Sequence, residues 1–181
     1  NLAVDFNSII KNESLVKKNI KKTTMNSKII ISNLSYGYNE ANLILDNLTL
    51  TINKNKKIGI SGESGCGKST LIKILAGLIK PSAAEFIIDD SIKVKNDYLN
   101  LKGITFVPQN IFIINDSIRK NIAFGISDEK IDNKKVNDCI KKVQLDQMIN
   151  AFSDGINHHL LERGKNLSGG QIQRIGIARA L

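Results

Sequence analysis

The chain lacks several features that would each indicate a particular class of protein. It has only two cysteines, Cys66 and Cys139, and their spacing does not suit a metal site. This excludes a disulfide scaffold and indicates reduced thiols, as in a cytosolic protein. No apolar run approaches the ~18 residues that a bilayer-spanning helix needs, and the first residues show no signal-peptide pattern. We therefore expect no membrane-spanning helix within these residues.

Basic runs interleaved with aromatic residues are also missing, although the chain is strongly basic. Its formal net charge of +9 would by itself suggest nucleic-acid binding. The lysines are scattered, however, and Ile, Asn and Lys are over-used along the whole chain. We therefore expect no nucleic-acid partner.

A glycine-rich loop is the most informative local feature that is present. Residues 62–70 read GESGCGKST, which matches the phosphate-binding pattern of Gly, four residues, Gly, Lys and Ser or Thr. The β-rich run 57–61 precedes it, and residues 69–78 carry apolar side chains at helical spacing. The pattern predicts a nucleotide-binding site formed by Gly62, Ser64, Gly65, Cys66, Gly67, Lys68, Ser69 and Thr70.

The residue types in this loop suit phosphate chemistry. Glycines let the backbone turn tightly, so that successive N–H groups converge on phosphate oxygens at the positive end of the following helix. Lys68 is expected to reach the β- and γ-phosphates, and the Ser69 hydroxyl to ligate Mg²⁺. The alternative is a glycine-rich turn that binds nothing, and the flanking strand and helix patterns argue against it.

A second motif near the end of the chain narrows the class. Residues 166–174 read NLSGGQIQR and are followed by IARAL at 177–181. This segment resembles the signature of ABC-type ATPases, and the resemblance extends over about residues 29–181. It implies that Ser168, Gly169, Gly170 and Gln171 contact the γ-phosphate of ATP held by a second ATPase domain, in a head-to-tail dimer. A simpler alternative is that Ser168 only caps a helix that begins at Gly169.

Two further segments resemble nucleotide-site elements of the same family. Residues 103–110 resemble the Q-loop, in which Gln109 would help to coordinate Mg²⁺ or the attacking water. The alternative is an ordinary loop glutamine. Residues 34–38 resemble the segment whose aromatic side chain stacks on adenine, and Tyr38 best matches the stacking position. An ordinary strand aromatic is the alternative, because Leu34, Tyr36 and Tyr38 also alternate along one sheet face.

Residues 115–125 indicate the subfamily. Their sequence, NDSIRKNIAFG, resembles the segment after the Q-loop in exporters with fused membrane and ATPase domains. Residues 126–132 add a resemblance to the group of lipid-linked oligosaccharide flippases. The resemblance implies transmembrane-domain partners and a location at the cytoplasmic face of the inner or plasma membrane. A soluble, non-transport ABC ATPase and a nonhydrolytic nucleotide-binding module remain as alternatives.

The expected fold class is therefore α/β, a P-loop NTPase of the ABC ATPase type with a mixed sheet core and a helical subdomain. We expect a linker or tail at 1–28 and a partial ATPase domain at 29–181, divided into a nucleotide-binding core, 29–109, and a helical subdomain, about 110–181. The predicted elements are strands at 29–38, 43–52, 57–61 and 85–89 and a helical region at 134–152.

The family pattern also contains catalytic residues that this sequence does not contain. After the Ala-Arg-Ala-Leu segment the family has a strand ending in Asp and Glu, the Walker B motif, and then a histidine, whereas the sequence ends at Leu181. That glutamate is the general base. We therefore expect the domain to be truncated before Walker B. We also expect an ATPase in the full-length protein, with Lys68 and Gln109 as catalytic residues and ATP and Mg²⁺ bound, and an isolated fragment that is inactive.

Overall fold

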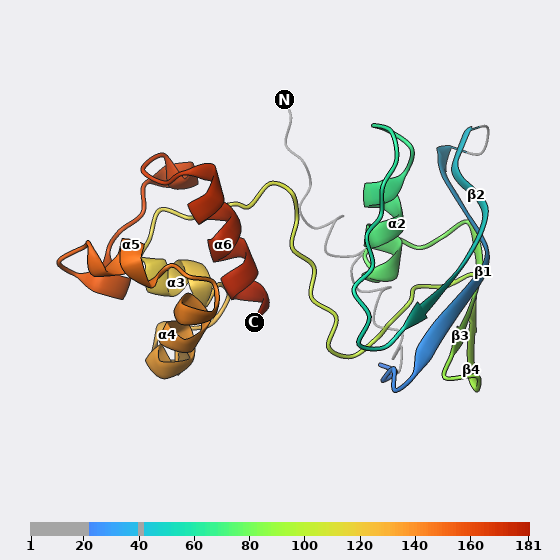
Figure 1. Ribbon diagram of the computed structural model, residues 1–181, viewed down its shortest axis with the longest axis horizontal. Coiled ribbons are helices and arrows are strands. Elements are labelled where there is room, and N and C mark those ends of the chain that lie inside the picture. Colours follow the sequence, from blue (N-terminus) through green and yellow to red (C-terminus); the bar gives the residue numbers. More distant parts are fainter. Residues whose placement is uncertain (1–21, 40–41) are drawn as a thin grey trace, which may run out of the picture. The chain divides into compact units, whose positions relative to one another are not determined.

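The computed structural model describes residues 22–39 and 42–181, which form two compact units, one within Asn1–Ile104 and the other Thr105–Leu181 (Figure 1). Each unit has its own cluster of buried apolar side chains. The predicted tail, 1–28, lies mostly outside the described residues. In the part of the chain that the structure describes, every helix is too short or too polar to cross a bilayer.

The first unit is a four-stranded sheet with strand order β2-β1-β3-β4 and one helix beside it (Figure 1). All three strand pairings are antiparallel. An isolated bridge between Thr23 and Leu101 adds a parallel pairing. The elements are β1 (Lys28–Asn39), β2 (Asn42–Asn53), α2 (Lys68–Leu75), β3 (Ala83–Ile88) and β4 (Ile92–Lys95).

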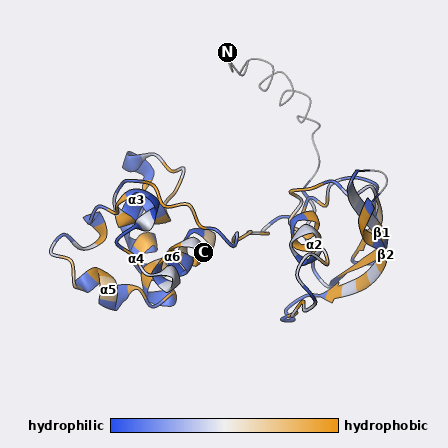
Figure 2. Cartoon of the chain, turned by 90° about the horizontal axis from the view of Figure 1, so that it is seen from above, coloured by the Kyte–Doolittle hydropathy of each residue, from blue (hydrophilic) through white to orange (hydrophobic). Residues whose placement is uncertain are grey.

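Alternation of apolar residues explains how this sheet packs. Every second residue of β3 is buried, and the first part of β1 follows the same rule. The helix α2 turns Leu71 and Ile74, three residues apart, toward the same core. Orange hydrophobic residues are visible along β1 and β2 in Figure 2. The fully buried side chains of this core include Ile31, Leu34, Ile74, Phe86, Ile88 and Leu99.

The strand predicted at 57–61 is not formed, and the β-rich run 103–108 is also irregular. Ile58, Ile60 and Ile104 are exposed by 53%, 40% and 43%. A strand forms only when a neighbouring strand pairs with its backbone N–H and C=O groups. Among the described residues, no strand pairs with either run. The predictions of strands at 29–38, 43–52 and 85–89 are confirmed by β1, β2 and β3.

The last residues of the predicted tail are anchored to the sheet by one carboxylate. Asp89, in the turn between β3 and β4, accepts backbone hydrogen bonds from Asn26, Ser27 and Lys28 at 2.7, 2.7 and 3.1 Å. These bonds, the one from Asn26 above all, hold the pKa of Asp89 below its usual value. Residues 26–28 are therefore joined to the body of the first unit.

The second unit is helical. It contains α3 (Ile118–Ile122), α4 (Asn133–Lys142), α5 (Asp146–Asn150), α6 (Gly169–Ala180) and the 3₁₀ turns η2 (Asp128–Lys130), η3 (Gly155–Asn157) and η4 (Glu162–Gly164). The helical region predicted at 134–152 is present as α4 and α5, separated where Gln144 adopts a left-handed φ of 56°. Ser117 caps α3, and Asp132 caps α4. The core around α6 includes the fully buried Ile113, Ile118, Leu145, Leu160 and Ile175.

Candidate nucleotide-binding site

The predicted phosphate loop leads directly into the first turn of α2. Gly67 is the N-cap residue, with a left-handed φ of 93°, and no side chain caps the helix. A Cβ at this position would lie 2.8 Å from Ile44 Cγ2 and 2.9 Å from Leu45 Cδ2, so packing against β2 as well as conformation requires glycine. The loop is therefore held against β2, whereas Gly65 is exposed, with no atom within 4 Å of where a Cβ would lie.

Lys68 lies inside the curve of this loop. Its Nζ donates to the carbonyl oxygens of Gly62 and Glu63 at 2.9 and 2.5 Å and lies 3.7 Å from Cys66 Sγ. The loop thus holds the positive charge of Lys68 beside its own backbone carbonyl groups. Because these partners are neutral carbonyls, an anionic oxygen would be a stronger acceptor for the same ammonium group.

The start of α2 fits a polyphosphate and its Mg²⁺ ion. The first N–H groups of a helix have no intrahelical acceptor and carry a partial positive charge. Ser69, in that first turn, is exposed, whereas Thr70 is buried. Among the described residues, no group of three or more His, Cys, Asp or Glu side chains could hold a metal ion. A hydroxyl donor such as Ser69, completed by phosphate oxygens, suits Mg²⁺, which does not require an all-protein cage.

The second motif forms the start of α6, as the capping alternative predicted. Ser168 is the N-cap residue, its Oγ accepts from the Gln171 N–H at 3.3 Å, and Gln171 Oε1 accepts from the Ser168 N–H at 2.7 Å. This is a complete capping box. Gly169 and Gly170 are exposed, with no atom within 4 Å of where a Cβ would lie. The helix start is therefore capped, exposed and positively polarised.

Residues 45–181 match the model of the ABC transporter family. The chain belongs to this family. A lacticin-481/lactococcin-DR transport/processing ATP-binding protein of Lactococcus lactis subsp. lactis is 40% identical over 90% of this chain and 22% of that protein. The ATP-dependent lipid A-core flippase of Francisella tularensis subsp. holarctica is 32% identical over 87% of this chain and 26% of the flippase.

A solved structure of a bacterial Atm1-family ABC exporter with ATP bound is also similar, with a TM-score of 0.73 and 25% identity. The alignment covers 97% of this chain and 32% of that one. These findings confirm the predicted family and its P-loop NTPase fold class. The chain spans less than a third of the length of each of these relatives.

Tyr38, the candidate for adenine stacking in this ABC domain, lies near the end of β1 with 67% of its surface exposed. Its ring meets Tyr36 edge-on, with centroids 5.2 Å apart. Tyr36 is paired with Leu45, one of the two β2 residues that pack against Gly67. The two tyrosines and the phosphate loop thus lie at the same part of the sheet, and an exposed ring there leaves stacking on a base possible.

Gln109, the Q-loop candidate of the ABC family, lies in the second unit and is exposed. Its backbone carbonyl accepts a hydrogen bond from Gln173 Nε2 at 2.8 Å. The structure therefore brings the segment after residue 108 to α6, the helix that begins with the signature. The phosphate loop belongs to the first unit, so Gln109 and Lys68 lie in different units of the chain.

The sequence interpretation missed the polar residues that organise this unit, above all Asn121. This side chain is fully buried: its Oδ1 accepts from the Ile114 N–H at 3.0 Å, and its Nδ2 donates to the carbonyl oxygens of Ile114, Asp116 and Ser117. The sequence contained one indication of this role, because Asn121 lies on the same apolar helix face as Ile118 and Ile122. A polar residue at such a position must be hydrogen-bonded.

Proposed function

We propose that this chain is the ATP-binding part of an exporter-type ABC transporter subunit, which couples ATP binding and hydrolysis to movement of a substrate across a membrane. One observation supports this most strongly. The same chain presents two helix starts beside exposed glycines, α2 with Gly65 and Lys68 and α6 with Gly169 and Ser168. The N-terminus of a helix binds anions, so one helix start could bind the phosphates of the chain's own nucleotide and the other those of a nucleotide held by a partner domain.

Each residue then has a defined part in the reaction. The backbone N–H groups of 65–70 bind the phosphates, and Lys68 leaves the carbonyl oxygens of Gly62 and Glu63 to contact the β- and γ-phosphate oxygens. Ser69 would hold Mg²⁺, which would neutralise phosphate charge, and for Gln109 the family resemblance alone implies a role toward Mg²⁺ or the attacking water. Tyr38 stacks on the adenine.

The signature acts on the nucleotide of a second ATPase domain. Ser168, Gly169 and Gly170 and the first N–H groups of α6 contact the γ-phosphate bound by that partner, and this stabilises charge on the transferred phosphoryl group. The residues 1–181 thus supply binding and charge stabilisation. We assign proton abstraction to no residue among 1–181.

The whole protein is proposed to work at the cytoplasmic face of a membrane, with transmembrane domains as partners. The relatives named as a flippase and as a transport/processing protein, and the ATP-bound exporter structure, support this assignment. Fractionation of the natural full-length protein tests it. Recovery with membranes, and release only by detergent, is the expected result, while recovery in the supernatant favours the soluble ABC ATPase alternative.

Calorimetry of Mg-ATP binding to the full-length protein tests the nucleotide site. Replacing Lys68 by Ala removes charge-assisted hydrogen bonds that are each worth about 1.5–3 kcal/mol, so we expect affinity to fall about 10- to 100-fold. Lys80→Ala is the matched control, because Lys80 is exposed and lies beyond the end of α2. Equal affinities of the Lys68 variant and the unmutated protein would contradict the assignment.

A further inference from the structure

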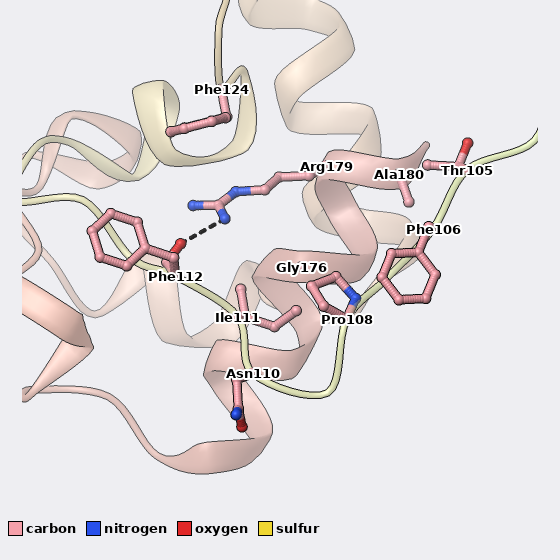
Figure 3. Close-up of a pocket in the computed structure, with 10 residues that line it drawn as sticks. All are labelled: Thr105, Phe106, Pro108, Asn110, Ile111, Phe112, Phe124, Gly176, Arg179 and Ala180. Atoms are coloured by element: carbon pink, nitrogen blue, oxygen red, sulfur yellow. Dashed lines mark hydrogen bonds between the residues drawn. The ribbon is translucent and has the colours of Figure 1, made fainter. Parts of the chain in front are cut away.

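One face of α6 holds the segment 109–112 at three points. Gln173 Nε2 donates to the Gln109 carbonyl at 2.8 Å, and Arg179 Nη1 donates to the Phe112 carbonyl at 2.6 Å. Between them, Gly176 lets Ile111 lie directly on the helix backbone, as Figure 3 shows. Residues spaced by three along a helix share a face. The three contacts therefore follow one line along α6.

Each contact depends on the residue type at its α6 position. A Cβ at Gly176 would lie 2.4 Å from Ile111 Cδ1 and 2.7 Å from Ile111 Cγ1. Arg179 is itself fixed, because its Nε donates to the Asn121 carbonyl at 2.5 Å and its Nη2 to Asn121 Oδ1 at 3.0 Å. Its guanidinium also lies 5.1 Å from the centre of the Phe124 ring. The donor that reaches Phe112 is thus held in place on both sides.

Both hydrogen bonds to the segment end on backbone carbonyl oxygens. They fix the path of the backbone and leave the exposed side chain of Gln109 free for other contacts. Apolar packing alone would be enough to place a loop on a helix. Here two polar side chains also donate to main-chain oxygens, one on each side of the Ile111 contact. This arrangement suits a loop whose position matters and whose glutamine must remain available.

We propose that Gln173, Gly176 and Arg179 are positioning residues for Gln109, and that they make the segment 109–112 move together with α6. The inference rests on the proposed function. Contact of the α6 start with the nucleotide of a partner domain would then shift the backbone of Gln109 in its own subunit. ATP bound at one site of the dimer would in this way affect the catalytic glutamine of the other.

ATP hydrolysis by the natural full-length protein in lipid nanodiscs provides the first test. Gln173→Met keeps the length of the side chain and removes the donor, and we expect kcat to fall about 3- to 10-fold. The KM for ATP should stay within about twofold, because Gln173 acts through the Gln109 backbone and is not assigned to bind the nucleotide. Ile177→Ala is the control, because Ile177 is on the same helix and 44% exposed.

A compensating pair separates positioning from general damage. Gly176→Ala raises helix propensity, so a fall in kcat must come from the added methyl group. Removing the opposing atoms by Ile111→Ala in the same protein should restore kcat to within about twofold. In a Gln109→Ala background, Gln173→Met should have no further effect, because residues that act through one group are not additive.

A spin-label pair at Asn110→Cys and Ile177→Cys, with the native cysteines replaced by serine, tests the contact without using activity. One narrow distance, unchanged by ATP, is expected, and Gly176→Ala should broaden it. A broad distribution in the protein without Gly176→Ala, or unchanged kcat in both the Gln173→Met and Gly176→Ala proteins, would overturn the inference. Failure of the full-length protein with its native cysteines to bind or hydrolyse ATP, while the labelled protein shows the narrow distance, would instead refute the proposed function.

Discussion

Replacing Asn121 by Ala should destabilise the helical unit far more than the small volume of the removed side-chain atoms suggests. The change removes the acceptor for the Ile114 N–H and the donor to the carbonyl oxygens of Ile114, Asp116 and Ser117. Because Asn121 is fully buried, the Ile114 N–H left without an acceptor costs about 1–3 kcal/mol. The three carbonyl oxygens keep a backbone donor each, so loss of their bonds to Asn121 adds only about 1 kcal/mol, and the sum is roughly 2–4 kcal/mol.

Hydrogen exchange of the Ile114 amide in the full-length protein measures this effect directly. At 1.4 kcal/mol per factor of ten, exchange should become about 30- to 700-fold faster. Asn137→Ala is the control, because Asn137 is an exposed asparagine on α4, and it should leave the rate unchanged. An Asn121→Ala protein whose Ile114 amide exchanges at the original rate would show that the buried amide does not hold this segment.

Two further predictions concern the first unit. Alkylation of the exposed Cys66 with N-ethylmaleimide should abolish calorimetric Mg-ATP binding in a Cys139→Ser protein, because its Sγ lies inside the loop beside Lys68; labelled protein with full affinity would refute this. Hydrogen bonds to Asp89 stabilise the fold above the usual pKa of 3.8, and this stabilisation should be lost as the pH falls through the lower folded pKa. Amide exchange of 26–28, corrected for the intrinsic pH effect, should therefore accelerate below pH 3.8, and Asp89→Asn, the comparison, should lose that pH dependence.

The local parts of the fold were predictable from the sequence. Alternating and helical patterns predicted β1, β2, β3, α4 and α5 to within a few residues, because these patterns report which face of an element is buried. The predicted helix at 69–78 was too long. The structure ends α2 at Leu75, shortly before Gly77, which adopts a left-handed φ of 71°.

The features that depend on distant partners were not predictable in the same way. Residues 57–61 have the composition of a strand, but a strand requires a neighbour, and composition does not say whether one is paired with it. The contact of Gln173 with Gln109 joins positions 64 residues apart, and no local pattern marks it. Whether Lys68, Ser69, Tyr38 and Gln109 perform their assigned roles remains a prediction.

The length of α6 determines how far one end of the helix moves when the helix tilts about its other end. A straight helix of 12 residues is about 18 Å long, so a tilt of about 10° about one end moves the other by about 3 Å. The hydrogen bonds from Gln173 and Arg179 to the segment 109–112 originate about 9 Å apart along this axis. Because the segment 109–112 is attached to α6 at two separated points, it would follow a rotation of the helix as well as a translation. A change in the tilt of α6 would therefore reorient the segment, and not only shift it.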